Sequence, residues 1–178
     1  MTQRAIGRPA PSEYAADYGR YLDLVPHDDI IETLEKQMQS TLDLLSTVSE
    51  ERASFRYAPD KWSIKEVVGH IIDSERVFAY RALVFARADL TSLPGFEQDD
   101  YVRAAGFDRL SASSLTQELA LVRAATLALF KSFDHDAWQR WGKANGVDFT
   151  VRAVAYIIAG HERHHVRVLQ ERYLAHLG

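Results

Sequence analysis

A helical period in four long segments is the feature that most constrains the fold of this chain. Apolar side chains recur at steps of three and four, as a helix with one buried face requires. The segments span about residues 29–50, 62–88, 111–133 and 150–174. Alternating strand patterns are weak, and only residues 146–151 resemble a short extended piece. The sequence therefore predicts an all-α fold built as a four-helix bundle.

Polar residues mark where these helices begin. Ser63 and Glu66 form the S-x-x-E capping box, in which two side chains bond otherwise unpaired amides at a helix start. Thr150 is the expected N-cap of the fourth helix. Asp28 and Asp29 suit the positive N-terminal end of the first helix.

The connection between the second and third helices is long, from about Leu90 to Leu110, and Asp99–Ala105 is expected to form a short helix inside it. A connection of this length argues against the simplest up-down-up-down order of helices. Three of the five prolines lie in residues 1–27, which we expect to form an irregular arm. Residues 28–178 then form a single domain, large enough for a hydrophobic core.

Composition excludes several classes of function. The chain has no cysteine, so disulfides, thiolate metal sites and cysteine nucleophiles are excluded. Its net charge is -4, from 21 basic and 25 acidic residues, and no strongly basic stretch is present, so we expect no nucleic-acid partner. Residues 1–20 lack the apolar core of a signal peptide, and no apolar run approaches the roughly 18 residues of a membrane span. We therefore expect a cytoplasmic protein without a membrane partner.

The fourth segment carries GHERHH at residues 160–165, three histidines on an apolar helix. At about 100° per residue, His161 and His165 lie roughly 40° apart in the middle of the apolar stripe, whereas His164 lies on its shoulder. The i,i+4 spacing stacks the two inward rings on one face, where both can reach a single ion. His164 in place of His165 is an alternative that puts one ring off the stripe.

His70 lies inside the apolar stripe of the second helix. If the second and fourth helices are neighbours, three imidazoles can meet in the core, and three protein ligands leave a divalent ion with an open position. The alternative is that each histidine is an ordinary buried residue, hydrogen-bonded to a neighbour. Two inward histidines one turn apart favour the metal site, because a shared cation satisfies both rings at once.

Two stretches around these histidines, KWSIKEVVGHIIDSE and RAVAYIIAGHERHH, resemble the DinB/YfiT-like superfamily. The resemblance covers about residues 31–174 and implies a four-helix bundle with an unusual connection, often assembled as a homodimer. It also implies a divalent metal held by three histidines, which places the ligands at His70, His161 and His165. Such relatives include bacillithiol S-transferases, mycothiol-dependent maleylpyruvate isomerases and proteins labelled metal-dependent hydrolases. The resemblance therefore implies a small-molecule substrate but no single reaction.

A site of three neutral histidines suits transition metals rather than magnesium or calcium, which prefer oxygen ligands. Zinc or nickel is the first expectation, with iron, cobalt, copper or manganese as alternatives. Such an ion could activate water for hydrolysis or bind a substrate thiol as thiolate. Because the chain has no cysteine, a low-molecular-weight thiol cosubstrate would have to supply the sulfur. The competing hypothesis is a non-catalytic protein with a structural metal site or a dimeric interaction role.

Candidate catalytic groups beside the histidines are Arg81 and Glu162. Arg81 follows the inward line of His70 and could hold a substrate carboxylate or phosphate, or form a structural salt bridge at the end of the bundle. Glu162 lies on the flank of its apolar stripe, where it is a general base or, on the favoured interpretation, a surface acid. Asp73 could orient a histidine ring, whereas Glu75 points away and is expected in solvent.

Two loops carry further signals. If the loop LPGFEQDDY folds over the metal, Phe96, Asp100 and Tyr101 would line the site. Alternatively, Asp99 and Asp100 cap the short helix. The dipeptide Asn145-Gly146 predicts a turn.

Overall fold

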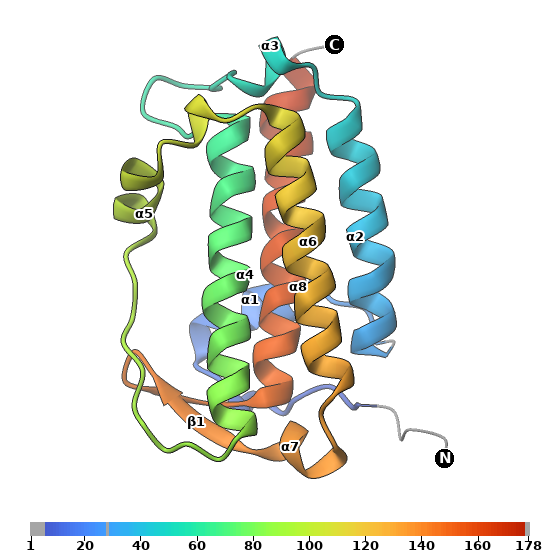
Figure 1. Cartoon of the computed structure of the whole chain (residues 1–178), viewed down its shortest axis with the longest axis vertical. Helices are drawn as coiled ribbons and strands as arrows, with labels where there is room; N and C mark the ends of the chain where they lie inside the picture. Colours follow the sequence, from blue (N-terminus) through green and yellow to red (C-terminus); the bar gives the residue numbers. More distant parts are fainter. Residues whose placement is uncertain (1–5, 28, 177–178) are drawn as a thin grey trace.

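The computed structural model describes residues 6–27 and 29–176. Residues 1–5 of the predicted arm, and Asp28 at the predicted domain start, lie outside the described residues. Four long helices run side by side as one bundle (Figure 1). They are α2 (Ile30–Ser46), α4 (Ile64–Ala86), α6 (Ala112–Lys131) and α8 (Val151–Val168). Because α4 packs against both α6 and α8, the predicted all-α four-helix bundle is confirmed.

The four long helices start where the sequence predicted. Asp29 caps α2, its carboxylate accepting hydrogen bonds from two backbone amides. Both bonds of the capping box are present at α4: the Glu66 amide donates to the Ser63 hydroxyl at 3.1 Å, and the Ser63 amide donates to the Glu66 carboxylate at 2.8 Å. Ser111 and Thr150 are the N-caps of α6 and α8. Hydrogen bonds from N-cap side chains therefore fix the first residue of each long helix.

Shorter elements close the ends of the bundle and form its connections (Figure 1). The short helices are α1 (Gly19–Leu22), α3 (Glu50–Ala53), α5 (Gln98–Ala105) and α7 (His135–Gln139). Turns of 3₁₀ type occur at Pro11–Glu13, Ala16–Tyr18, Phe107–Arg109 and Leu174–His176, and a π-helical turn, Leu169–Tyr173, continues α8. α5 confirms the short helix predicted inside the long connection. Within the described ranges, no helix has the length and apolar character needed to cross a membrane.

The N-terminal segment is more structured than the irregular arm that we predicted. Two 3₁₀ turns and α1 fold it back, α1 packs against α8, and Leu22 is fully buried. Arg152, near the start of α8, donates two hydrogen bonds to the Glu13 carboxylate, one of them at 2.7 Å. At Gly160 the packing is so close that an added Cβ would lie 2.1 Å from the carbonyl oxygen of Tyr21. The segment is therefore part of the packed structure around α8.

The long connection between α4 and α6 is joined to a β-hairpin. This hairpin pairs β1 (Trp141–Ala144) with β2 (Val147–Thr150) in antiparallel register. The predicted turn Asn145-Gly146 links the strands with φ of 53° and 75°, as a type I′ turn requires. Leu93 bonds the hairpin backbone through both its amide and its carbonyl, each at 2.9 Å. β2 confirms the expected extended piece, whereas β1 was not predicted.

Two apolar clusters fill the bundle. The first surrounds the C-terminal half of α4 and the N-terminal half of α8, and includes Phe85, Phe130, Trp138, Phe149, Val154 and Ile157. The second surrounds the start of α4 and the π-helical turn, and includes Ile71, Ile72, Val102, Phe107, Leu115 and Leu169. Along α8 the first cluster ends at Ala159 and the second resumes at Leu169, so the histidine-rich residues lie between them.

Candidate metal centre

Three histidine rings meet where α4 faces α8. The Nε2 atoms of His70 and His161 are 3.0 Å apart, and those of His161 and His165 are 3.2 Å apart. One ligand atom from each ring lies within 4.8 Å of the others. His70 and His161 are buried and His165 is half-buried. The structure therefore brings together the three histidines selected from the sequence.

Burial keeps these rings neutral. It lowers the pKa of His70 to about 4 and, with the charges of the neighbouring histidines, the pKa of His165 to about 3. The pKa of His161 lies well below its usual value for the same two reasons. A neutral imidazole keeps one nitrogen with a free lone pair, which is the form that binds a metal. Three lone-pair nitrogens that face one another lack enough N–H donors to bond all of them. A divalent transition metal can bind all three at once, so the arrangement fits such an ion.

Neighbouring side chains orient the rings. The hydroxyl of Ser74, one turn after His70, lies 3.4 Å from His70 Nδ1. The Nε2 atom of the same ring points at the other histidines, which makes it the candidate ligand atom of His70. Trp62 packs on the His70 ring at 4.9 Å between centroids, and Tyr21 packs edge-on against His161 at 5.4 Å. The sequence-based prediction missed Ser74, although its position four residues after an inward histidine was a usable signal.

A pocket of about 320 Å³ opens beside the histidines. Charged, aromatic and apolar side chains line it: Tyr57, Asp60, Lys61, Trp62, Val67, Asp99, His164, His165, Val168 and Tyr173. Burial dominates the pKa of His70, but the negative charge of Asp99 acts on the same ring and opposes that shift. Although His164 lines this pocket, it is outside the three-histidine group found among the described residues. The pocket gives a small molecule access to the half-buried edge of the triad.

The first turn of α5 contributes a different residue from those predicted. Asp99 lines the pocket beside the histidines, whereas Phe96 and Tyr101 line a separate hollow. Asp100 is exposed and pairs with Arg103 at 2.7 Å. The prediction that Phe96, Asp100 and Tyr101 line the metal site is therefore wrong. The reason is helical geometry, because residues 99 and 101 of α5 lie about 200° apart around its axis.

Comparison with known proteins decides the family. The model of the DinB superfamily matches residues 33–169, which is most of the chain. The chain belongs to the DinB superfamily. Among solved structures, it is similar to YfiT from Bacillus subtilis, described as a probable metal-dependent hydrolase with an unusual four-helix bundle topology. That similarity has 14% sequence identity and a TM-score of 0.67, and it covers 94% of this chain and 92% of YfiT.

Two further structures share the fold of this DinB superfamily member. A DinB-like protein from Bacillus subtilis, YjoA, has 20% identity and a TM-score of 0.62, covering 85% of this chain and 93% of that one. A mycothiol-dependent maleylpyruvate isomerase has 12% identity and a TM-score of 0.66, covering 82% of this chain and 61% of that one. No curated protein matches the chain. Identities this low show a common fold and leave the reaction open.

The acidic residue beside His161 is buried in this DinB superfamily member, and not exposed as predicted. Glu162 accepts a hydrogen bond from Arg123 at 2.7 Å and another from Gln37. Arg123 also bonds both carboxylate oxygens of Glu75, each at 2.8 Å. The predictions of a surface Glu162 and a solvated Glu75 are both wrong. Arg123 reaches in from α6 and supplies a counter-charge that lets both acids be buried.

The remaining candidates lie away from the rings. Arg81 stands about 16 Å beyond His70 along α4, as eleven residues of helix require. It is buried and donates to the Pro94 carbonyl at 3.0 Å, and it forms no ion pair with any residue that the structure describes. The predicted salt bridge of Arg81 is therefore absent from that part of the chain. Asp73 pairs with Arg76 at 3.5 Å, and no histidine ring is among its hydrogen-bond partners in the same residues.

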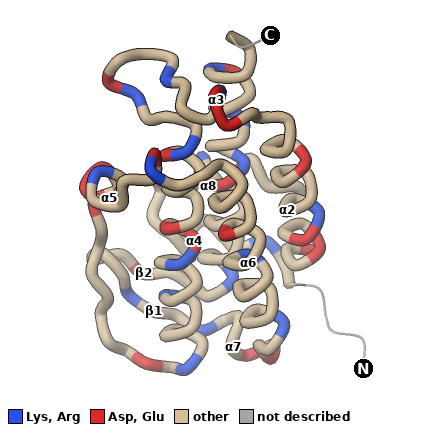
Figure 2. The backbone as a smooth tube through the Cα atoms, turned by 45° about the horizontal axis from the view of Figure 1, so that its top comes forward, with Lys and Arg blue, Asp and Glu red and all other residues tan. Residues whose placement is uncertain are grey.

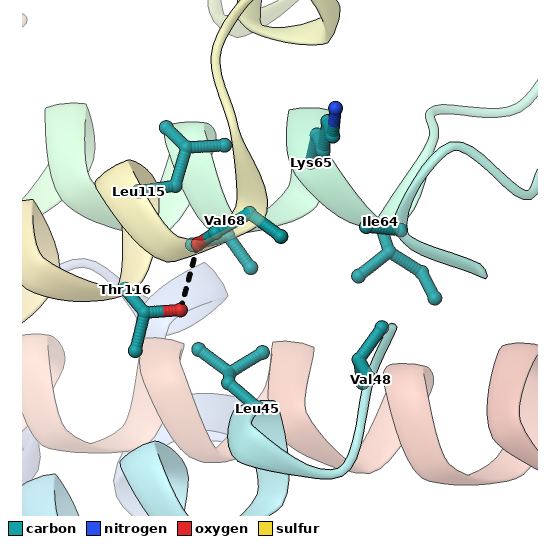
Figure 3. A pocket seen from close by; sticks show the side chains of 9 residues that line it. Leu45, Val48, Ile64, Lys65, Val68, Leu115 and Thr116 are labelled. Carbon is teal, nitrogen blue, oxygen red and sulfur yellow. Dashed lines mark hydrogen bonds between the residues drawn. The ribbon is translucent and has the colours of Figure 1, made fainter. Parts of the chain in front are cut away.

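A small hollow at the other side of the bundle is a packing gap. It lies where the end of α2 faces the starts of α4 and α6 (Figure 3). The hydroxyl of Thr116 is already bonded to the Ala112 carbonyl at 2.9 Å, and Lys65 is paired with Glu50. Its apolar walls come from Leu45, Val48, Ile64, Val68 and Leu115. With about 10 Å³ of space it has room for about one water molecule.

Proposed function

We propose that this DinB superfamily member is a metal-dependent enzyme that acts on a small molecule. His70, His161 and His165 hold a divalent transition metal, and the substrate enters the pocket lined by Asp99 and Lys61. The observation that carries the proposal is the convergence of three neutral Nε2 atoms, 3.0 and 3.2 Å apart, at the edge of an open pocket. A structural ion is usually enclosed by four protein ligands, whereas three ligands leave a position for chemistry.

The donor set selects the class of metal. Three imidazoles without a carboxylate among the converging ligands suit zinc or nickel, followed by iron, cobalt, copper or manganese, and disfavour magnesium and calcium. When bound, such an ion offers a position at which water or a thiol loses its proton near neutral pH. The contact between the Ser74 hydroxyl and His70 Nδ1, at 3.4 Å, orients one ligand ring for this purpose.

Other residues of the pocket can serve in proton transfer and in binding the substrate. Asp99 is exposed in the first turn of α5 and faces the pocket, where its carboxylate can accept the proton released by the nucleophile. Lys61 also lines the pocket, where its ammonium is paired with the Asp60 carboxylate at 2.9 Å. Trp62 and Val168 supply apolar walls for the substrate body. The substrate class that fits is a small, partly apolar molecule with a polarised carbonyl or similar electrophile.

Water is the first candidate nucleophile and a thiol is the second. The fold similarity to YfiT, described as a probable metal-dependent hydrolase, supports hydrolysis. The fold similarity to a mycothiol-dependent isomerase supports a thiol cosubstrate. Because the chain has no cysteine, any thiol must enter as a separate molecule. We expect a small-molecule substrate in both cases.

Metal content tests the ligands. Elemental analysis of tag-free protein should find about one transition metal per chain in the wild type. The variants His70→Ala, His161→Ala and His165→Ala should lose it. His164→Ala is the matched control, because this ring lines the same pocket without joining the triad, and it should keep the metal. Metal retained in all three ligand variants, or absent from wild type after reconstitution with zinc or nickel, would contradict the proposal.

Turnover tests the enzyme. Zinc-loaded and nickel-loaded protein should hydrolyse small activated esters, or transfer a low-molecular-weight thiol to an electrophile, and Asp99→Asn should lower kcat without removing the metal. A protein that binds metal through the triad but turns over neither class is the non-catalytic alternative, with a structural ion.

Size-exclusion chromatography with light scattering tests the homodimer that the family resemblance predicts.

A further inference from the structure

A second hollow, distinct from the metal pocket, lies under the long connection. It opens between α4 and the loop that precedes α5, with a volume of about 300 Å³, at the lower end of the range for small-molecule sites. Its charged lining residues are Arg76 and Arg81, and its apolar lining residues include Val77, Leu93, Pro94 and Phe96. The hydrogen bonds of Leu93 to the hairpin backbone fix this rim in place.

Arg81 is the unusual residue of the hollow. Charged residues of both signs are interspersed along the chain (Figure 2), and the equally buried Arg123 has two carboxylate partners. Arg81 is 3% exposed, yet its described contacts are neutral: the Pro94 carbonyl, the Tyr18 hydroxyl and the face of the Phe78 ring. Burial lowers the pKa of its guanidinium, with Tyr18 opposing the shift. A guanidinium remains charged in proteins, so this site holds a buried positive charge without a described counter-ion.

The other cation at the rim is already neutralised. Arg76 pairs with Glu118 at 2.7 Å and lies close to Asp73, and about half of its side chain is exposed. Two aromatic side chains at the mouth are open to solvent, Tyr80 at 57% and Tyr101 at 45%. Apolar surface around a single buried charge is the pattern of a site for an amphipathic anion.

We propose that this hollow binds a small organic carboxylate with an apolar, ring-sized body. The planar guanidinium of Arg81 receives the carboxylate, and the aromatic and aliphatic walls cover the body. The site is about 16 Å from His70 along α4, so a ligand of this size cannot touch the metal centre at the same time. The proposal is therefore independent of the function proposed for the three histidines.

Val77 provides a matched pair of variants. It lines the hollow four residues before Arg81 on the same helix, the spacing at which an introduced carboxylate reaches an arginine. Val77→Glu should supply an internal counter-ion and weaken binding of phenylacetate by at least about tenfold. Val77→Gln has the same size without the charge, and should bind within about threefold of wild type. Arg81→Met should abolish binding, with circular dichroism to confirm that it folds.

Calorimetric titration with phenylacetate measures the affinity. 2-Phenylethanol, which keeps the ring and lacks the charge, should bind at least about tenfold more weakly. His165→Ala should leave the phenylacetate affinity unchanged, because binding at Arg81 does not use the metal centre. The proposal is overturned if phenylacetate does not bind, if both Val77 variants behave alike, or if binding disappears in His165→Ala and so belongs to the metal. Equal affinity for phenylacetate and inorganic phosphate also overturns it, because the apolar walls would then contribute nothing.

Discussion

Removing Arg123 should destabilise this protein more than removing an arginine from its surface. The side chain is 1% exposed and makes four hydrogen bonds, to both oxygens of Glu75, to one oxygen of Glu162 and to the Leu34 carbonyl. In Arg123→Met the side-chain volume is roughly kept while all four bonds are lost. Two carboxylates, each 2% exposed, then remain in the core without their cation.

The size of the loss follows from the charges left behind. Breaking a buried ion pair by removing one partner costs about 3–5 kcal/mol, because the remaining charge is uncompensated. That is a large part of the roughly 5–15 kcal/mol by which a domain is stable. Combining Arg123→Met with Glu75→Gln and Glu162→Gln removes the stranded charges, and should restore at least about 2 kcal/mol of the loss.

Urea denaturation of metal-free protein at pH 7 measures these differences. Arg103→Met is the matched control, since Arg103 is 75% exposed and pairs with Asp100 one turn away. It should lose less than about 1 kcal/mol. If Arg123→Met loses no more than this control, or if the triple variant is no more stable than Arg123→Met, the reasoning about stranded buried charge is refuted.

Three further predictions concern the histidines and the packing around α8 and α4. In metal-free protein the unfolding free energy should fall as the pH drops from about 6.5 toward 4, by up to about 1.4 kcal/mol per pH unit for His70. The reason is that the unfolded chain takes up a proton in this range, whereas the buried ring, with its pKa lowered to about 4, does not. Urea denaturation of wild type and His70→Ala across this range should show a shallower pH dependence in the variant. Gly160→Ala should lower stability by about 1–3 kcal/mol, because its Cβ would lie 2.1 Å from the carbonyl oxygen of Tyr21; an unchanged melting temperature would contradict the close packing of α1 on α8. Ser63→Ala should cost about 1–2 kcal/mol, because it removes the bond from the Glu66 amide and the bond that the Ser63 hydroxyl donates to Asp108 at 2.6 Å. Ser63→Thr keeps a hydroxyl and should lose less in the same denaturation.

Local signals were enough to predict the helices and to select the histidines. Ser63 and Thr150 mark helix starts, because each side chain accepts a hydrogen bond from the backbone amide three residues later. The angle of His161 and His165 on their own helix depends on helical geometry alone, so the sequence identified both as inward. His70 needed one further condition, that α4 and α8 are neighbours, and the structure meets it.

The buried ion cluster could not be predicted from single helices. A helical wheel gives the direction of Glu75 relative to the apolar residues of α4, but it does not show what a neighbouring helix places there. One signal was available: Leu119, Arg123 and Leu127 are spaced at i, i+4 and i+8, which puts a cation in the middle of an apolar face. A cation on an apolar face favours carboxylate partners from other helices, but the sequence does not say which acids reach it.

β1 was missed for a different reason. Trp141–Ala144 has no alternating pattern to mark it as a strand, and its pairing depends on β2 and on Leu93 of the long connection. The turn Asn145-Gly146 was recognised as a turn, and its type I′ geometry is the hairpin signal. The arm was underestimated because short 3₁₀ turns have little sequence periodicity and gain their stability from packing on α8.

The two partners His70 and His161 are separated by 91 residues in the chain. An ion that holds both would close a loop of that length, and so act as a reversible cross-link between the middle of the sequence and its last long helix. A covalent link across a loop of about 100 residues restricts the unfolded state by roughly 4–5 kcal/mol, whereas an ion that leaves on unfolding stabilises the folded state only. A chain with no cysteine has no disulfide to provide such a restraint. The metal would instead hold α4 and α8 together in the folded state alone, and its loss would loosen the junction of these two helices first.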